Sequence, residues 1–495
     1  MKIFNYLIIF ILSVYPHLEV TSKPHSKDKG YQVNFDVVLD TSIHSTPFLI
    51  VYENSFYETP FQADRQEIFP VSKKGNSYLF TLSDEKRPMY FSLAYREGQH
   101  VIFILDSYHY EPGDNIKLAV KKAKAPRLFF ATFTGKNAGK YRCQYDLASS
   151  KKVLNYGISK DLNSTHNNFD EVKILMKAQQ DIIDKYKADI SAYSFNLFKL
   201  DSKSKLFYQL LSKWNAYFSQ AKINKDSILL NKLVSEYSNF QDIFETTNVG
   251  VDSILFDSRY YSKFLQCTID IEYLIADRKL DYYSLFNTIK KIPSRSLRDK
   301  LIVSYFYRNS TDISANFPDL LRHAISKVEN KQSLEKLHEF TRISKGKEAF
   351  DFELQDVNGK LIKLSQFKNK VVFIDFWFTG CGACKSYYKD VLCEVEQIYE
   401  NNKDVVFVTI CIDQDKQKWI NSINEGKYTS KKVVNLYTNG EGSNHPLIRF
   451  YNIIGYPQPL IIDQKGYIAK FKGRELRSKD RLIEEIEKTR KLYLR

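Results

Sequence analysis

The chain has 495 residues, of which 43% are hydrophobic, so it is long enough to form two or three domains with real cores. The formal net charge of +15 comes from 73 basic and 58 acidic residues, and these are spread along the chain instead of forming a dense Lys/Arg block. The sequence contains neither a basic stripe with interleaved aromatic residues nor a nucleic-acid reader motif, so we expect no nucleic-acid partner.

The first segment has the pattern of a targeting signal. Lys2 is followed by an apolar run from Ile3 to Val14, and polar residues follow at Thr21–Lys23. This run is too short for a comfortable membrane span. We therefore predict a signal peptide over residues 1–22 and an exported protein of the periplasm or cell envelope. A retained N-terminal membrane anchor is the alternative.

Residues 31–145 are predicted to form a β-rich, sandwich-like domain, with a small barrel as the alternative. Short runs that alternate in the manner of strands are separated by polar turns. The runs are Val33–Leu39, Phe48–Tyr52, Ser77–Leu82, Tyr90–Tyr95, Val101–Leu105 and Ile116–Val120. His109 lies between Tyr108 and Tyr110, and a lone histidine at a strand end is structural more often than catalytic, so we assign it no chemistry.

Residues 163–344 are predicted to form an all-helical domain. Apolar residues recur there at three- and four-residue spacing in seven segments. The segments are Phe169–Tyr186, Lys205–Ala221, Ser227–Phe244, Ser253–Ala276, Asp281–Ile292, Leu297–Tyr307 and Phe317–Val328. Asp281, Ser294 and Asp312 are candidate helix caps. Because this region has no fixed-period repeat and no binding signature, we expect a spacer or docking domain.

The C-terminal part carries a redox motif. The apolar run Val371–Phe376 predicts a buried strand, which ends shortly before Cys381-Gly-Ala-Cys384. A helix is predicted from about Cys384 to Tyr399. The unpaired amides and the dipole at its start favour the thiolate of Cys381 and lower its pKa. Cys384 lies one turn further along, where it can attack a mixed disulfide formed by Cys381.

The residues around this motif resemble a thioredoxin-fold domain. Asp375-Phe-Trp377 precedes the cysteine pair, and Gly455-Tyr-Pro457 follows much later. The lead-in Phe350–Lys360 is similar to the TlpA/ResA-like branch of extracytoplasmic thiol-disulfide oxidoreductases. The resemblance covers about residues 346–495. It implies a C-terminal α/β thioredoxin fold within a multidomain α+β chain.

The remaining elements follow the order expected of that fold. We predict strands over Val405–Ile412, Val433–Tyr437, Gln458–Ile462 and Tyr467–Phe471, and helices over Lys416–Asn424 and Lys479–Leu494. Two departures from the family pattern matter. Gly380 precedes the first cysteine where many relatives have tryptophan, and Ala383 occupies the position of the proline found in thioredoxin. Both changes are expected to alter the redox potential and the substrate surface.

The resemblance implies roles for four residues. Cys381 is the nucleophile and Cys384 resolves the mixed disulfide. Asp375 matches the buried acid of thioredoxins, and burial would raise its pKa and make it a proton acceptor for Cys384. A structural aspartate bonded to backbone is the alternative. Pro457 matches the cis-proline, beside which the backbone is free to pair with an extended substrate segment.

The other four cysteines have no assigned chemistry. Cys267 lies on an apolar helical face, where an inert buried thiol is the default, and a pairing with Cys143 stays open. Cys393 and Cys411 are interpreted as buried thiols. We expect no cofactor and no metal, because a zinc site needs two further ligands and neither a second Cys-x-x-Cys nor paired histidines follow.

The sequence thus favours an exported thiol-disulfide oxidoreductase that acts on protein substrates with disulfides or thiols. In an oxidising compartment, a membrane or periplasmic electron donor must keep its cysteine pair reduced if it acts as a reductant. Two other functions are weighed against it. A thiol peroxidase requires a Pro-x-x-x-Thr-x-x-Cys arrangement that neither Cys381 nor Cys384 has. A binding or scaffold protein would keep the thioredoxin part as a retained module.

Overall fold

The structure is a computed structural model, and it describes residues 32–52, 65–82, 89–97, 100–123, 129–150, 165–244, 252–309, 317–453 and 455–493. The signal peptide expected over residues 1–22, and the anchor that is its alternative, lie outside these ranges. None of the helices within them combines the length and the hydrophobicity that a membrane-crossing segment needs.

The chain divides into two compact units. The first contains the described residues up to Leu301 and the second those from Ile302 onward, so the boundary falls inside α9 (Arg295–Arg308). The last helices of the expected helical region, α10 (Phe317–Lys327) and α11 (Lys331–Arg342), therefore belong to the second unit. They are held to the end of α9 by aromatic contacts, in which the ring of Phe306 packs against the rings of Phe317 and Phe340.

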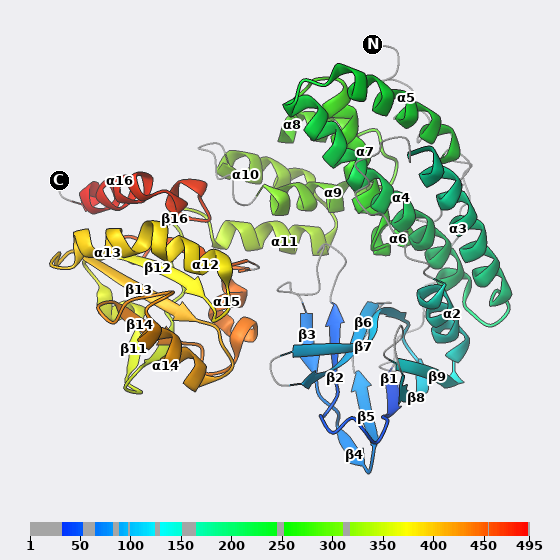
Figure 1. The fold of residues 1–495 in the computed structure, drawn as a ribbon, viewed down its shortest axis with the longest axis horizontal. Helices are drawn as coiled ribbons and strands as arrows, with labels where there is room; N and C mark the ends of the chain where they lie inside the picture. The colour runs from blue at the N-terminus through cyan, green and yellow to red at the C-terminus, as the bar shows by residue number, and fades with distance from the viewer. Residues whose placement is uncertain are drawn as a thin grey trace. The chain divides into compact units, whose positions relative to one another are not determined.

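The first unit begins with two β-sheets (Figure 1). One has the strand order β4-β5-β1-β8-β9 and the other has the order β3-β2-β6-β7. The strands are β1 (Val33–Val38), β2 (Phe48–Tyr52), β3 (Arg65–Ile68), β4 (Ser72–Lys74), β5 (Ser77–Leu82), β6 (Met89–Glu97), β7 (His100–Tyr110), β8 (Asn115–Lys122) and β9 (Phe129–Lys136). Inward-facing side chains of both sheets share one core, in which the ring of Phe35 on β1 lies 4.6 Å from that of Phe91 on β6.

Helices follow the sheets. They are α2 (Ala138–Ser149), α3 (Thr165–Lys185), α4 (Ala192–Ile223), α5 (Ser227–Phe244), α6 (Asp252–Asp257), α7 (Tyr261–Ile275), α8 (Tyr282–Ile289) and α9. The single helix expected over Ser253–Ala276 is two helices, because the hydroxyl of Ser258 accepts a hydrogen bond from the Tyr261 amide and begins a new helix there. Asp281 and Ser294 cap α8 and α9 as expected, whereas Asp312 lies outside the described residues.

A buried ion pair joins the sheets to the first helix. Nζ of Lys140 on α2 lies 2.7 Å from a carboxylate oxygen of Asp114 and 2.8 Å from one of Glu111. Asp114 also accepts hydrogen bonds from the side chains of Asn137 and Tyr141. Nearby, the ring of His109 is fully buried against aromatic rings, and burial lowers its pKa and keeps it neutral. This histidine packs in a core and has the structural role expected of it.

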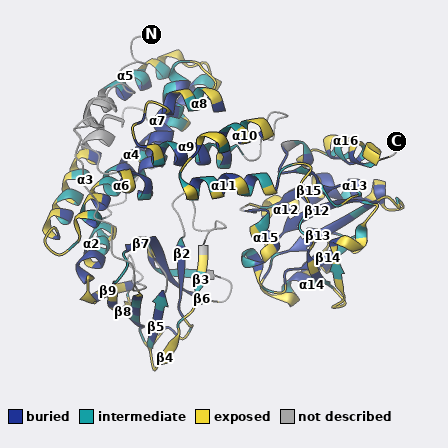
Figure 2. Cartoon of the chain, turned by 180° about the vertical axis from the view of Figure 1, so that it is seen from behind, coloured by how far each residue is buried: buried dark blue, intermediate teal, exposed yellow. Residues whose placement is uncertain are grey.

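The second unit contains a seven-stranded sheet with the order β11-β10-β14-β13-β12-β15-β16. Its strands are β10 (Glu353–Asp356), β11 (Leu361–Lys363), β12 (Val371–Trp377), β13 (Val405–Cys411), β14 (Val434–Tyr437), β15 (Gln458–Ile462) and β16 (Ile468–Phe471). Every residue of β12 is buried, which explains its continuous apolar sequence (Figure 2). β12 pairs in parallel with β13 and antiparallel with β15.

Helices cover this sheet. They are α12 (Gly382–Tyr387), α13 (Cys393–Tyr399), α14 (Lys416–Glu425), α15 (Pro446–Phe450) and α16 (Lys479–Arg490). The helix expected over Cys384–Tyr399 is interrupted by a π-helical turn at Tyr388–Leu392, which connects α12 to α13. Its apolar residues pack with Leu482 and Ile486 of α16 over the face of β12 that carries Val371 and Phe373.

Candidate active site

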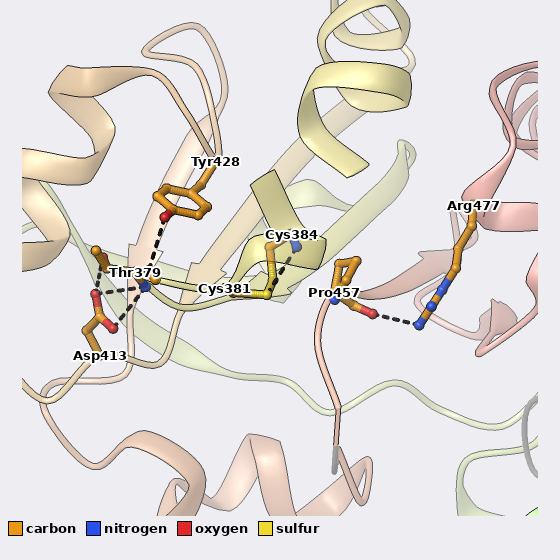
Figure 3. The surroundings of a disulfide bond; sticks show 8 residues. Thr379, Cys381, Cys384, Asp413, Tyr428, Pro457 and Arg477 are labelled. Atoms are coloured by element: carbon orange, nitrogen blue, oxygen red, sulfur yellow. Dashed lines mark hydrogen bonds between the residues drawn. A yellow bond between two sulfur atoms is a disulfide. The ribbon is translucent and has the colours of Figure 1, made fainter. Parts of the chain in front are cut away.

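Cys381 and Cys384 form a disulfide, with their Cα atoms 5.3 Å apart (Figure 3). Cys381 is the N-cap of α12, and its sulfur accepts a hydrogen bond of 3.1 Å from the Cys384 amide. Cys381 is 6% exposed and Cys384 is 1% exposed, while Gly382 and Ala383 between them are exposed. Both cysteines are therefore buried beneath an exposed Gly-Ala pair, and Cys381 is slightly more exposed than Cys384.

Pro457 lies at the same edge of the sheet. The peptide bond between Tyr456 and Pro457 is cis. Gln458, the next residue, is paired with Phe376 near the end of β12, so Pro457 stands opposite the point where the chain leaves β12 for Cys381. Figure 3 shows the proline ring beside the disulfide. The ring of Tyr456 packs against the side-chain cluster that contains both cysteines.

Asp375 lies in the middle of β12, between Thr409 of β13 and Pro459 of β15. It alternates with Val371 and Phe373, so its side chain is on the face that the Cys384 helix covers. Asp375 is 2% exposed, and its Oδ1 atom has no hydrogen-bond partner among the described residues. Burial raises the pKa of this carboxyl well above its usual value, although the Phe376 amide and the charge of Arg477 oppose the rise.

The loop between β12 and Cys381 is fixed by side chains from later in the sequence (Figure 3). The Thr379 amide donates hydrogen bonds of 3.1 and 3.3 Å to the carboxylate of Asp413, which follows β13. The Thr379 hydroxyl also donates to Asp413. The next amide, that of Gly380, donates a hydrogen bond of 3.0 Å to the phenol oxygen of Tyr428.

Arg477 fixes the proline on the other side of the disulfide. Its guanidinium donates a hydrogen bond of 3.0 Å to the carbonyl of Pro457 (Figure 3). The positive charge also favours the ionised form of Asp375. Sequence reasoning did not identify Asp413, Tyr428 or Arg477. They lie 32 to 96 residues after Cys381, and no local pattern marks them as neighbours of the motif.

The remaining cysteines and His445 have other positions. Cys143, Cys267, Cys393 and Cys411 are thiols in this structure, and all of these except the half-buried Cys393 are buried. Burial raises the pKa of the Cys411 thiol, so it stays protonated. His445 caps α15 by accepting a hydrogen bond from the Leu447 amide. Among the described residues, no group of three or more His, Cys, Asp or Glu side chains is arranged to hold a metal ion.

This geometry suits two-electron thiol chemistry. Cys381 and Cys384 are joined by a disulfide. Cys381 lies at the start of a helix, where the amides and the helix dipole stabilise a thiolate. A buried carboxyl with a raised pKa lies under the helix that carries the other cysteine. Of the four residues predicted from the sequence, Cys381, Cys384 and Pro457 lie near one end of β12, and Asp375 lies within that strand.

Comparisons with known proteins agree with this chemistry. A family model described as thioredoxin-like matches residues 369–468. The thiol-disulfide oxidoreductase ResA of Bacillus thuringiensis is 31% identical over 144 residues, which are 29% of this chain and 77% of that protein. ResA of Bacillus subtilis is 27% identical over 136 residues, which are 26% of this chain and 66% of that protein.

Solved structures give a similar result. The thioredoxin domain of a thiol-disulfide oxidoreductase from Bacteroides vulgatus is 26% identical; the match covers 29% of this chain and 96% of that one, with a TM-score of 0.26. The expected C-terminal thioredoxin fold and the expected resemblance are both confirmed by the family model and the curated relatives. This chain therefore belongs to the thioredoxin-like family of ResA-type thiol-disulfide oxidoreductases, and it is an oxidoreductase of that class.

Proposed function

We propose that this protein is an exported oxidoreductase whose Cys381/Cys384 pair exchanges a disulfide for two thiols with protein substrates. The observation that carries the proposal is the cysteine pair itself, which forms a disulfide at the start of α12, with Cys381 as the N-cap and the slightly more exposed residue of the two. Pro457 beside it and Asp375 beneath it support the same chemistry. The predicted signal peptide supports export to the periplasm or cell envelope.

In the reductive direction, the first step is attack on the substrate. The thiolate of Cys381 attacks one sulfur of a substrate disulfide, a new sulfur–sulfur bond forms between enzyme and substrate, and the other substrate sulfur leaves as a thiolate that takes a proton from solvent. The amide of Cys384, which donates to the Cys381 sulfur, and the dipole of the helix stabilise the attacking thiolate.

The second step releases the product. Cys384 gives its proton to the carboxylate of Asp375 and attacks the Cys381 sulfur of the mixed disulfide. The enzyme disulfide closes, and the second substrate sulfur leaves as a thiolate. Two electrons have then passed from the enzyme to the substrate. An electron donor of the membrane or periplasm must return two electrons to the enzyme disulfide before the next cycle.

The surroundings of the disulfide support a protein as the substrate. A side-chain carbon added at Gly382 or Gly455 would meet no atom within 4 Å, and neither glycine has a positive φ. The space around these two glycines, one next to Cys381 and one two residues before Pro457, is thus not filled by other atoms of the chain. The backbone next to Pro457 lies at the end of β15, where an extended substrate segment can pair with it as an added strand.

Activity assays on the full-length protein test the proposal. The reduced protein is incubated with a disulfide-containing protein such as insulin, and the appearance of substrate thiols is measured. Serine at either Cys381 or Cys384 is expected to abolish turnover, because each cysteine is required once per cycle. Cys393→Ser on the same helical segment is the matched control and is expected to retain full activity. Turnover that survives loss of both motif cysteines would favour the scaffold alternative.

The direction of electron flow is set by the redox potential of the couple. A redox potential of about −270 mV or below is typical of a reducing cysteine pair, and a redox potential of about −120 mV is typical of a strongly oxidising one. Equilibration with dithiothreitol or glutathione buffers measures this potential directly. We expect the reductive value, and a strongly oxidising value would reverse the direction of both steps.

Sequencing the N-terminus of the protein isolated from the cell envelope tests export.

A further inference from the structure

The amide of Gly380 is held by a side chain. Gly380 directly precedes the nucleophilic cysteine, and its N–H donates a hydrogen bond of 3.0 Å to the phenol oxygen of Tyr428 (Figure 3). Gly380 adopts a φ of 99°, and a side-chain carbon added there would meet nothing within 4 Å. Glycine has the freest backbone of all residues, and here neither a side chain nor crowding restricts it. The hydrogen bond to Tyr428, and not packing, is therefore what restrains the backbone of Gly380.

Tyr428 is itself held rigidly. It is buried, and its ring stacks on that of Trp377 at the end of β12, with the centroids 5.1 Å apart and the planes 7° from parallel. The next residue, Thr429, is fully buried and hydrogen-bonded to Asn435 at 2.8 Å. The phenol oxygen is therefore a fixed point from which the Gly380 amide is positioned.

The residues on either side of Gly380 are also fixed. The preceding amide, that of Thr379, is held by Asp413, and the following amide, that of Cys381, donates a hydrogen bond of 3.2 Å to the carbonyl of Phe378. With Tyr428, three consecutive amides of the loop are held. The result is that the Cys381 sulfur stays at the start of α12, within 3.1 Å of the Cys384 amide.

We infer that Tyr428 is a positioning residue for the nucleophile. By fixing Gly380, it keeps the sulfur of Cys381 in line with the amides at the start of α12, where the thiolate is stabilised. Tyr428 does not touch the substrate disulfide, and it acts through the backbone of Gly380. This inference rests on the proposed function, in which Cys381 is the attacking thiolate.

Removing one oxygen atom tests the inference. Tyr428→Phe keeps the ring and its stacking on Trp377 but removes the acceptor for the Gly380 amide. The variant is made in full-length protein that also carries Cys384→Ser, so that only the first attack is observed. The rate of reaction with an aromatic disulfide, dithiobis(nitrobenzoate), is measured as a function of pH. Protein with serine at both motif cysteines gives the background from the other thiols.

The expected result is a change in the pH profile. Losing a hydrogen bond worth about 1 kcal/mol corresponds to about a fivefold change in an equilibrium constant. We expect the rate at pH 7 to fall about fivefold and the midpoint of the profile to move to higher pH, because Cys381 spends less time aligned with the helix amides. An unchanged profile would overturn the inference.

Tyr437 provides a matched control. Its ring also stacks on a tryptophan, Trp419, at 4.9 Å, and its hydroxyl donates a hydrogen bond of 2.9 Å to the carbonyl of Gln414. Tyr437→Phe therefore removes one hydrogen bond from the same core without touching Gly380. We expect its pH profile to match that of the parent protein. If both tyrosine variants move the profile equally, Tyr428 contributes only general stability and the inference is wrong.

A measurement on the wild-type protein needs no variant. The Gly380 amide is expected to exchange its hydrogen with solvent slowly in the oxidised protein, because it is hydrogen-bonded. Exchange as fast as in an unstructured peptide would overturn the inference. If the Cys384→Ser protein with intact Tyr428 does not react above background, the proposed function itself fails; if it reacts but Tyr428→Phe changes nothing, only the role of Tyr428 is lost.

Discussion

Replacing Asp375 with asparagine removes a charge that burial disfavours and keeps the shape of the side chain. Burial raises the folded-state pKa of this carboxyl well above its ordinary value of 3.8, so between these two pKa values the folded protein holds a proton that the unfolded chain has lost. The contribution of Asp375 to wild-type stability is therefore greatest below pH 3.8 and falls as the pH rises toward the folded-state pKa. The fall is about 1.4 kcal/mol per pH unit over that interval.

The variant lacks this dependence because an amide does not titrate in this range. The difference in unfolding free energy, variant minus wild type, is expected to increase by about 1.4 kcal/mol per pH unit above pH 4 and to level off at the folded-state pKa. Urea unfolding of the oxidised full-length protein, followed for the transition of the unit that contains β12, measures this slope. The unmatched hydrogen-bonding groups of asparagine shift the whole curve but not its slope. A flat difference would refute the assignment of a raised pKa to Asp375.

The same substitution separates the two chemical steps. Asp375 is proposed to accept the proton of Cys384, so its loss is expected to slow resolution of the mixed disulfide by about 100-fold, a typical contribution of a general base. The first attack by Cys381 is expected to change far less. Stopped-flow mixing of reduced enzyme with a disulfide substrate resolves the two phases. Equal slowing of both would point to the structural alternative, in which Asp375 only bonds to the backbone.

Three further variants have specific expectations. Burial raises the pKa of Glu396 to about 7 from 4.5, so Glu396→Gln is expected to gain about 3 kcal/mol of stability relative to wild type between pH 4.5 and 7 in urea unfolding, and a loss there would contradict this. Arg477→Gln keeps a donor for Pro457 but removes the charge, so the pH midpoint of the resolution step is expected to rise, as a stopped-flow pH series would detect. Lys140→Met leaves buried carboxylates without their cation and is expected to destabilise the first unit by about 3–5 kcal/mol in thermal unfolding, with Lys136→Met on β9 as the exposed control.

The local sequence pattern was sufficient to predict the strand β12 and the cysteine motif that follows it. The run Val371–Phe376 is apolar because both faces of β12 are covered, and such a run is recognisable without any partner. The cysteine spacing likewise predicts that Cys381 starts a helix, because the turn and the first helical residues are all local. Pro457 was found only through the family resemblance. The register of β15 with β12 explains why a residue so distant in sequence returns to the site.

Other features have no local signal. β4 consists of Ser72–Lys74, which are all exposed, so no apolar alternation marks it as a strand. The π-helical turn at Tyr388–Leu392 keeps the apolar spacing of an ordinary helix. The helix α2 begins at Ala138, inside the region that was predicted to be β-rich. It has no ordinary apolar helical pattern, because its buried residues include Gly139 and Lys140. Lys140 is buried in an ion pair with Asp114, and a single sequence does not display a contact of that kind.

The side chains that fix the active-site loop also have no local sequence signal. Asp413 follows the strand β13 and Tyr428 follows the helix α14, and each is an ordinary residue for a loop after such an element. Only the parallel pairing of β12 with β13 brings the carboxylate of Asp413 to Thr379, and only the stacking of Tyr428 on Trp377 directs its hydroxyl to Gly380. Their proposed influence on Cys381 is therefore visible in three dimensions alone.

Covalent trapping tests the central claim most directly. Full-length Cys384→Ser protein, reduced and then mixed with envelope proteins or with a disulfide-bonded model protein, is expected to accumulate mixed disulfides that disappear on treatment with dithiothreitol, because the first attack occurs and the resolving thiol is missing. Cys381→Ser protein is expected to trap nothing, since Cys384 is only 1% exposed and its proposed role is to attack the sulfur of Cys381. Absence of trapping by Cys384→Ser, or equal trapping by both variants, would contradict the assignment of Cys381 as the nucleophile.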